Sequence, residues 1–484
     1  MGAENDRLLI GGEWVAAGDG GYPVVNPATE QVVAEAPNAS VADAEAATSA
    51  AAGAFPAWAR TTPEHRAELL DRAADLLDKR RDELVPLVQA ETGATLRVTK
   101  SMQVPMAATR FRRYAKVEPN IVPLPPSVMP TTALAPGGII GAIEHRAPVG
   151  VVACITSYNF PLTNMAGKLA PALAMGNTAV VKPAWQDPLG VLRMCEVFEE
   201  AGFPPGVVNV VTASGAAPAE ALVASPDVDM VSFTGSTAVG CRIAEVAGRG
   251  MKRLLLELGG KGSAVVFADA DLASVVTAVS SVWAFHSGQI CTAPTRVLVH
   301  RSREDELVGM LAGVASSLKV GDPLERDTVV GPVITGAHRD RVEGYVRSAG
   351  EEGATVVAGG ERPGLDTGFY VAPTLVAGAR SEMTAVQEEI FGPVVVVVAF
   401  DDDDEAVALA NGTQYGLYDY VFSADTGRAM AVAKQLRSGT VGINTAQRNH
   451  EAAFGGFKMS GVGRDGGSWG LHAYSEMQSI VWPG

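Results

Sequence analysis

The stretch that decides the fold runs from Pro148 to Ala184 and reads PVGVVACITSYNFPLTNMAGKLAPALAMGNTAVVKPA. Two β-branched runs, VGVVACI and GNTAVVK, flank an alanine-rich segment, which predicts a parallel βαβ unit. The alternation continues through GVVNVVT, DMVSFTG and SAVVFADA. A second set, RVLVH, ATVVAGG, PVVVVVAF and SGTVGINT, follows Cys291. The sequence therefore predicts an α/β fold with two doubly wound lobes.

Three other segments have a recognisable character. Residues 40–116 are alanine-rich or carry apolar residues at three- and four-residue spacing, with a stop at Gly93, which predicts amphipathic helices. Residues 119–138 are too rich in proline for a helix or a central strand, so we expect an extended arm suited to subunit contact. The acidic run at residues 401–405 predicts a solvated helix start.

The composition narrows the function classes. The chain has 484 residues, enough for two or three domains, and 47% of them are hydrophobic and 19% charged, as in α/β enzymes. With 38 Lys and Arg against 54 Asp and Glu, a net charge of -16 makes nucleic acid an unexpected partner. Four cysteines without CxxC or Cys/His spacing predict a reducing compartment and no metal site.

The chain also lacks the signals of export and membrane anchoring. Its first residues have no basic segment followed by an apolar one, and Asp6 breaks the myristoylation pattern. The most apolar run, PVVVVVAF, is too short to span a bilayer and predicts a buried parallel strand. We therefore expect a cytoplasmic protein with no membrane partner.

One apparent nucleotide-binding motif is misleading. GVGRDG at residues 461–466 matches GxGxxG, but it follows a loop and leaves no room for a βαβ unit after it. The fingerprint requires a strand before it and a helix after it, so we do not assign it to a cofactor.

Seven motifs occur in order: PVGVVACITSYNFPLTN, KLAPALAMGNTAVVKPA, VSFTGSTAVG, LLLELGGKG, GQICTA, EEIFGPVV and FGGFKMSGVGRDGG. Together they resemble the aldehyde dehydrogenase superfamily, from GGEWV near the start to the closing SEMQSIVW. The resemblance implies NAD(P)-dependent, non-acylating oxidation of an aldehyde to a carboxylic acid through a cysteine thiohemiacetal and thioester. It also implies two Rossmann-like doubly wound domains and a small β oligomerisation arm.

The resemblance implies the following domain boundaries. We expect residues 1–123 and 148–258 to form the cofactor-binding domain, residues 259–465 the catalytic domain, and residues 124–147 and 466–484 the arm and C-terminal strand. If that strand adds to a neighbour's sheet edge, a homodimer or homotetramer follows.

Three residues match the family's catalytic motifs. Taken alone, Cys291 is most simply a buried apolar residue; with the resemblance it becomes the nucleophile, in a tight loop that we expect to run into a helix, whose amides would favour the thiolate. Asn159 in SYNFP matches the side-chain oxyanion donor, which acts with the backbone N–H of the nucleophile. Glu257 in LELGG matches the base that activates the hydrolytic water.

The expected cofactor is NAD or NADP. Lys182 would bind the adenosine ribose, and the backbone of Gly235 and Ser236 the pyrophosphate. Where the family usually has a glutamate that binds ribose hydroxyls and repels a 2′-phosphate, this chain has Trp185, which leaves the choice of cofactor open. The implied cofactor-binding residues are Lys182, Thr156, Ser157, Gly235, Ser236, Leu258, Glu389, Phe391 and Trp185.

The substrate would enter through a tunnel. Small Gly167 and the polar loop NTAQRNHEAAF, which includes Arg448 and His450, predict a roomy, polar-lipped tunnel for an aromatic or functionalised aldehyde. The implied tunnel residues are Phe160, Thr163, Asn164, Gly167, Ile290, Thr292 and His450. We assign no catalytic role to Asp465, which replaces a glutamate frequent in the family.

Three alternatives stay open. An acylating dehydrogenase would pass the thioester to coenzyme A, although such relatives generally lack a base like Glu257. A hydrolase would pair Cys291 with His286, five residues earlier, although packing explains His286 better. A binding protein could keep the fold without turnover.

Overall fold

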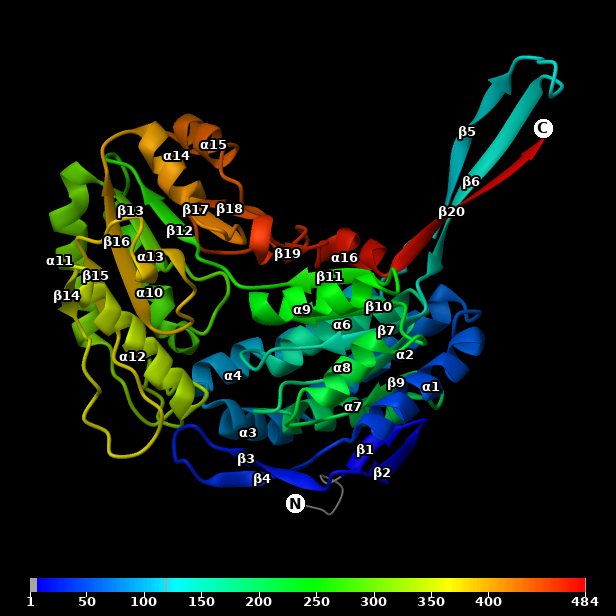
Figure 1. Ribbon diagram of the computed structural model, residues 1–484, viewed down its shortest axis with the longest axis horizontal. Helices are drawn as coiled ribbons and strands as arrows, with labels where there is room; N and C mark the ends of the chain where they lie inside the picture. The colour runs from blue at the N-terminus through cyan, green and yellow to red at the C-terminus, as the bar shows by residue number, and fades with distance from the viewer. Residues whose placement is uncertain (1–6, 118–119, 484) are drawn as a thin grey trace.

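The computed structural model describes residues 7–117 and 120–483, and Asp6 with the rest of residues 1–6 lies outside this part. Figure 1 shows two α/β lobes side by side and a long β arm that projects from one of them. Within the described ranges, no helix combines the length and apolar character needed to cross a membrane. The α/β class and the two lobes confirm the fold predicted from the sequence.

The first lobe is built on an eight-stranded sheet in the order β19-β11-β10-β7-β8-β9-β1-β2. Strands β11, β10, β7, β8 and β9 are parallel, while β1, β2 and β19 run antiparallel to their neighbours. The strands are β1 (Arg7–Ile10), β2 (Glu13–Ala16), β7 (Val151–Ile155), β8 (Thr178–Lys182), β9 (Val208–Val210), β10 (Met230–Thr234), β11 (Arg253–Glu257) and β19 (Gly461–Val462). Both strands of the opening stretch are fully buried, as parallel strands between two helical layers must be.

Helices cover both faces of this sheet. One core packs the sheet against α2, α3, α5, α6 and α7, and the other packs it against α1, α8 and α9. The helices are α1 (Val41–Trp58), α2 (Pro63–Lys79), α3 (Arg81–Thr92), α4 (Leu96–Met102), α5 (Val104–Tyr114), α6 (Pro161–Ala174), α7 (Leu189–Ala201), α8 (Ala217–Ala224), α9 (Thr237–Gly248) and α16 (Gly467–Ala473). Gly93 ends α3 in the left-handed conformation, with φ 67°, as the sequence predicted.

The second lobe has a seven-stranded sheet in the order β14-β15-β16-β13-β12-β17-β18, parallel except for β14. Its strands are β12 (Ser263–Val266), β13 (Arg296–His300), β14 (Thr355–Ala358), β15 (Thr374–Ala377), β16 (Val394–Phe400), β17 (Tyr418–Phe422) and β18 (Thr440–Ile443). The run PVVVVVAF forms β16, which is buried between β13 and β15, so this prediction is confirmed.

Helices also lie on both faces of the second sheet, α10 and α11 on one and α12 to α15 on the other. They are α10 (Leu272–Ala284), α11 (Glu304–Ser317), α12 (Gly336–Glu351), α13 (Thr384–Gln387), α14 (Asp403–Asn411) and α15 (Thr426–Ala433), with 3-10 turns η1 (His286–Gly288), η2 (Arg301–Arg303) and η3 (Lys458–Ser460). Asp402 caps α14 by accepting the backbone N–H of Glu405, which confirms the predicted acidic helix start.

The arm is a three-stranded antiparallel sheet of β5 (Ile121–Met129), β6 (Gly138–Pro148) and β20 (Ser475–Pro483), in the order β20-β6-β5. The proline-rich strand β5 lies at an edge and shifts register between Leu124 and Ser127, in agreement with its proline content. The arm begins a few residues before the expected range 124–147 and ends one residue after it. The C-terminal strand β20 pairs with β6 of the same chain.

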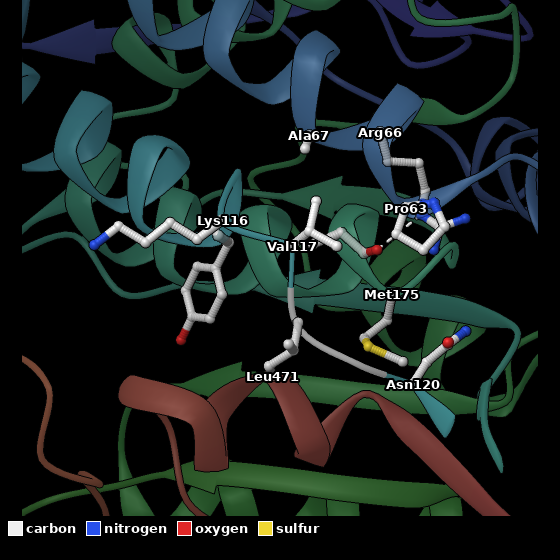
Figure 2. Close-up of a pocket in the computed structure, with 10 residues that line it drawn as sticks. Pro63, Arg66, Ala67, Lys116, Val117, Asn120, Met175 and Leu471 are labelled. Atoms are coloured by element: carbon white, nitrogen blue, oxygen red, sulfur yellow. Dashed lines mark hydrogen bonds between the residues drawn. The ribbon is translucent and has the colours of Figure 1, made fainter. Parts of the chain in front are cut away.

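Two smaller features complete the first lobe. Strands β3 (Gly21–Val25) and β4 (Val32–Pro37) form a separate hairpin. A narrow crevice of about 20 Å³ lies between α2 and the segment before β5 (Figure 2). Arg66 beside it donates to the carbonyl of Ala174 at 2.8 Å, at the C-terminal end of α6. None of the residues that line this crevice lines the cavity described next.

Candidate active site

A cavity of about 530 Å³ lies where the two lobes meet, and side chains from both sheets line it. Glu257 at the end of β11, Asn159 between β7 and α6, and Cys291 before β13 all face it. The sequence-predicted residues that line this cavity are Ser157, Asn159, Phe160, Thr163, Asn164, Gly235, Ser236, Glu257, Leu258, Ile290, Cys291, Thr292, Glu389, Phe391 and His450. The structure therefore brings the three expected catalytic groups together.

Four predicted residues do not line the cavity. Thr156 is buried, and its backbone N–H donates to the carbonyl of Lys182 at 3.2 Å. The Lys182 ammonium donates to Pro183 at 3.1 Å at the carboxyl end of β8, away from Cys291. Trp185 is 44% exposed on the surface beyond that strand. The space beside Gly167 is filled by the Arg110 guanidinium rather than left for substrate, so Gly167 does not widen the tunnel as predicted.

The loop before Cys291 is tightly constrained. His286, Ser287 and Gly288 have φ of 52°, 53° and 77°, and a Cβ at Gly288 would collide with the backbone of Gly392. After Cys291 the chain makes a turn and enters β13, so the expected helix after the nucleophile is wrong. The segment around Cys291 is irregular, with positive φ values and a close contact between Gly288 and Gly392, and Cys291 therefore does not lie at the N-terminus of a helix that would favour its thiolate.

Cys291 is partly exposed to the cavity. Burial, and then the carboxylates of Glu389 and Glu257, raise the pKa of the Cys291 thiol to about 12, while Arg448 and the residue's own backbone N–H lower it. In this state the thiol keeps its proton near neutral pH. That proton must leave before sulfur can act as a nucleophile.

The side-chain amide of Asn159 is fixed in orientation. Its Oδ1 accepts from Ser157 Oγ at 2.9 Å and from Asn164 Nδ2 at 3.3 Å, and its Nδ2 donates to the carbonyl of Gln289 at 2.9 Å. An amide nitrogen carries two hydrogens, so the second N–H is left to donate into the cavity.

Glu257 is 6% exposed, and neither carboxyl oxygen has a hydrogen-bond partner among the described residues. Burial, and then the negative charge of Asp465, raise the pKa of Glu257 well above its usual range, while Lys168 and Arg448 lower it. A carboxylate with a raised pKa binds a proton readily near neutral pH.

The other end of the cavity offers groups that suit a dinucleotide. Gly235 lies between β10 and α9, where a Cβ would collide with the Phe233 ring, and its backbone N–H donates to the Glu257 carbonyl at 3.0 Å. Ser236 caps α9, which places the N-terminus of this helix beside the cavity. Glu389 accepts the Gly260 backbone N–H at 2.8 Å through Oε1, which leaves Oε2 for another donor. These features fit the pyrophosphate and the nicotinamide ribose of NAD.

The Phe391 ring is held at the same end. The residue has φ 59°, which is rare for a bulky side chain, and its carbonyl oxygen lies 2.8 Å from His338 Nε2. Edge contacts to Tyr158 and His338, at 6.0 and 6.3 Å between ring centroids, hold the ring in place. The strained backbone therefore presents a fixed aromatic surface to the cavity.

His286 is buried among aromatic rings. Its ring centroid lies 5.4 Å from that of Phe160, its Nε2 has no hydrogen-bond partner in the described part of the chain, and burial lowers its pKa to about 4. These contacts fit the packing role expected for His286.

Several residues that line the cavity had no signal in the sequence. Arg110 and Met106 come from α5, and His338 and Arg341 come from α12. Each belongs to an ordinary helical pattern far along the chain from Cys291. A charged residue on the otherwise apolar face of α5 is the one hint that could have identified Arg110.

Comparison with known proteins agrees with the fold and the cavity. The model of the aldehyde dehydrogenase family matches residues 14–480. Phenylacetaldehyde dehydrogenase from Pseudomonas fluorescens is 38% identical, over 98% of this chain and 95% of its own. Geranial dehydrogenase from Castellaniella defragrans is 37% identical, over 99% of both chains.

Solved structures extend the comparison. A point mutant of betaine aldehyde dehydrogenase from Staphylococcus aureus, in complex with NAD+, has a TM-score of 0.94 and 35% identity, covering 99% of this chain and 97% of its own. A cysteine-to-alanine mutant of aldehyde dehydrogenase C from Pseudomonas syringae, with NAD+ and octanal, has a TM-score of 0.93 and 38% identity, covering 99% and 96%.

The fold and the cavity are those of an NAD-dependent oxidoreductase that acts on the aldehyde group. The chain belongs to the aldehyde dehydrogenase family, whose reaction converts an aldehyde to a carboxylic acid.

Proposed function

We propose that Cys291, Asn159 and Glu257 carry out hydrolytic aldehyde oxidation in this chain. The observation that supports this most directly is that a thiol, an oriented amide and a buried carboxylate without partners face one cavity. The remaining role assignments follow from the same geometry.

In the first step, the Cys291 thiol loses its proton through a water to solvent, and the sulfur bonds to the aldehyde carbon. Because burial raises the pKa of this thiol, the thiolate is a minor form near neutral pH, and its reaction with the aldehyde draws the ionisation forward. The developing oxyanion accepts hydrogen bonds from the free N–H of Asn159 and from the backbone N–H of Cys291. The product of this step is a thiohemiacetal in its oxyanion form, from which loss of a hydride alone gives a thioester.

In the second half of the reaction, the thiohemiacetal carbon loses a hydride and a thioester forms. When bound, NAD supplies the hydride acceptor. Glu257 then removes a proton from a water, whose oxygen bonds to the thioester carbon, and the C–S bond breaks. The carboxylic acid leaves, and the Cys291 sulfur regains a proton.

We expect groups that line the cavity and the end of β8 to hold the cofactor. Gly235, Ser236 and Leu258 lie beside the expected pyrophosphate position, and the free Oε2 of Glu389 suits a ribose hydroxyl. We expect Lys182 to bind the adenosine ribose of the cofactor. An indole at Trp185 neither accepts ribose hydroxyls nor repels a 2′-phosphate, so we propose a relaxed preference between NAD and NADP. Values of kcat/KM with NAD and with NADP that agree within about tenfold would support the relaxed preference, and a larger difference would contradict it.

The substrate is proposed to be an aromatic or functionalised aldehyde, because the cavity combines aromatic walls with polar groups at the loop of residues 444–453. Among the relatives, one is named for phenylacetaldehyde and another for geranial. Faster turnover of a long unsubstituted alkanal than of any aromatic or polar aldehyde would argue against this substrate class.

We further propose a homodimer or homotetramer in the cytoplasm. The arm exposes apolar side chains, such as Val128 at 81% and Val481 at 60%, which a second copy of the chain could cover. The expected cofactor domain (1–123 and 148–258) and catalytic domain (259–465) remain proposals as well. The pairing of Gly461 with Glu257 joins the end of the second segment to the first sheet.

The decisive experiment follows cofactor reduction with a panel of aldehydes in the wild-type protein and in Cys291→Ala and Glu257→Gln variants. Cys291→Ala should lose hydride transfer, and Glu257→Gln should form thioester and then stall. Acid formation without coenzyme A would separate this function from acylation. Full dehydrogenase activity in Cys291→Ala would exclude the mechanism.

A further inference from the structure

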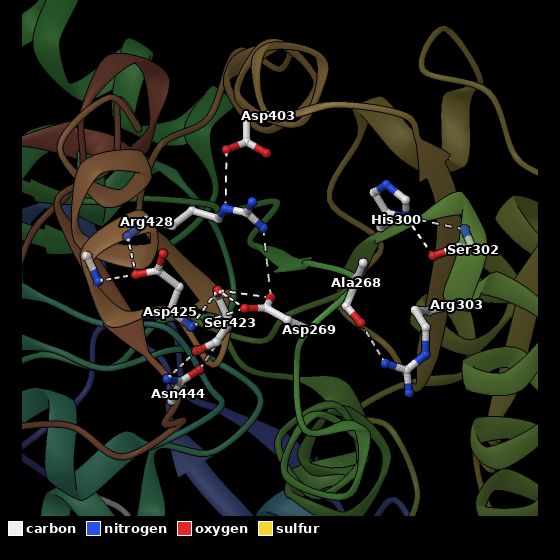
Figure 3. A network of polar contacts seen from close by, with 11 residues as sticks. Ala268, Asp269, His300, Ser302, Arg303, Asp403, Ser423, Asp425, Arg428 and Asn444 are labelled. Carbon is white, nitrogen blue, oxygen red and sulfur yellow. Dashed lines mark hydrogen bonds and ion pairs between the residues drawn. The ribbon is translucent and has the colours of Figure 1, made fainter.

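The loop of residues 444–453 is fixed at both ends. Asn444 donates through Nδ2 to the Ser423 carbonyl at 2.9 Å and accepts the Ser423 N–H at 3.0 Å, and Ser423 in turn donates to Asp269 at 3.0 Å (Figure 3). Just past the other end of the loop, Phe454 and Asp465 exchange two backbone hydrogen bonds of 2.6 Å. The loop is therefore anchored at both ends.

Arg448 lies in this loop and lines the same cavity as Cys291. Its guanidinium stacks on the Phe454 ring, 3.7 Å from the centroid. Over the part of the chain that the structure describes, it has neither a hydrogen bond nor a carboxylate within ion-pair distance. Burial lowers its pKa, yet an arginine stays charged at any physiological pH.

A partly buried cation without an anion is costly, because burial removes water without supplying a counter-charge. The neighbouring carboxylates do not supply this counter-charge. Arg110, in the same cavity, already has Asp465 at 3.8 Å, and Arg113 has Glu451 at 2.7 Å. The raised pKa of Glu257 weakens its negative charge near neutral pH. Among the described residues, Arg448 therefore has no carboxylate of its own.

Part of the wall of this cavity is apolar. Met102, Met106, Phe160, Phe285 and Ile290 line it. A ligand that matches this cavity thus needs an apolar body, an aldehyde at Cys291 and an anion at Arg448. A planar guanidinium binds a carboxylate through two parallel N–H donors.

We propose that Arg448 is a substrate-binding residue that selects aldehydes carrying a carboxylate at the end remote from the carbonyl. This rests on the proposed function, since the aldehyde end must reach Cys291. The reaction product would then be a dicarboxylic acid.

The test compares 4-carboxybenzaldehyde with its neutral methyl ester, methyl 4-formylbenzoate, using NAD. The wild-type protein should favour the acid in kcat/KM. Arg448→Met should reduce that preference about 10- to 100-fold, mainly through KM, with the ester little affected. Arg448→Lys, which keeps the charge, should retain much of the preference. Arg301→Met removes an arginine paired with Asp401 on the exposed surface and should leave the preference unchanged.

Two results would overturn the proposal. One is failure of the predicted preference, either because the wild-type enzyme prefers the ester or because the Arg448→Met variant keeps the wild-type preference. The other is an equal fall in kcat for both aldehydes, which would mean that Arg448 acts on Cys291 or Glu257 instead.

A binding measurement separates this proposal from the proposed function. In a Cys291→Ala background, where no covalent step occurs, calorimetry should detect 4-carboxybenzaldehyde binding that weakens about 10-fold or more when Arg448→Met is added. Failure of every aldehyde to reduce NAD would refute the proposed function, and loss of the Arg448 dependence in binding would refute the anion site. Thermal unfolding of each variant establishes that it is folded.

Discussion

Replacement of Asn159 by alanine tests the proposed oxyanion site most directly. The change removes the N–H that points into the cavity, and loss of one such donor typically lowers kcat by ~10²–10³, or about 2.7–4 kcal/mol. It also leaves the Gln289 carbonyl without the 2.9 Å bond from Asn159. An unsatisfied buried carbonyl costs about 1–3 kcal/mol of folding free energy. We therefore expect a modest loss of stability and a much larger loss of turnover.

The assay measures kcat and KM for one aldehyde by cofactor reduction, together with the thermal unfolding midpoint. The matched control is Asn164→Ala. It removes the 3.3 Å bond to Asn159 Oδ1 and a 3.4 Å bond to Ser157 Oγ, and it leaves the donor on Asn159 in place. A bond of this kind contributes about 0.5–1.5 kcal/mol, so the control should lose ~2- to 10-fold.

The result that would refute this reasoning is an Asn159→Ala enzyme that keeps more than a tenth of wild-type kcat. A loss confined to KM would refute it as well, since it would mean that Asn159 binds ground state and transition state equally.

Three further changes test other parts of the site. Because hydrolysis needs Glu257 as carboxylate and burial raises its pKa, wild-type kcat should fall as pH drops through that raised pKa. Glu257→Gln should show a burst of one cofactor reduced per active site and no such acid limb in its slow turnover; a wild-type-like pH profile would contradict this. Gly288→Ala should lower the unfolding free energy by about 1–3 kcal/mol, because φ is 77° and the Cβ would meet the Gly392 backbone. Gly53→Ala, a helical site with no atom within 4 Å, should stabilise by up to ~1 kcal/mol in the same melts, and equal effects of the two would be inconsistent with the strain argument. Trp185→Glu should lower kcat/KM with NADP about tenfold or more while NAD is retained, and an unchanged cofactor ratio would count against a ribose position for this residue.

Local patterns predicted many of the parallel strands and the helical character of residues 40–116. The β-branched runs of β7, β8 and β16 fell where expected, since strands buried on both faces have a nearly continuous apolar sequence. The stop at Gly93 followed from backbone conformation alone. Information of this kind is contained within a few consecutive residues.

Features that depend on distant contacts could not be predicted in the same way. The two-residue strand β19 has no pattern of its own and is defined by its pairing with β11. Arg110 fills the space beside Gly167, although 57 positions separate them in the sequence. The wrong expectation of a helix after Cys291 came from reading Gly288 as an ordinary turn, whereas three successive residues with positive φ set the direction of the chain.

Strand β19 also limits how the enzyme can release its product. It returns from the second lobe to pair with Leu256 and Glu257, and Ser460 accepts the Leu258 N–H at 3.0 Å. A hinge that swung the lobes apart would have to pull this strand from the first sheet and displace the proposed base. We therefore expect the product to leave without separation of the two lobes, while β19 stays paired with β11 beside the proposed base.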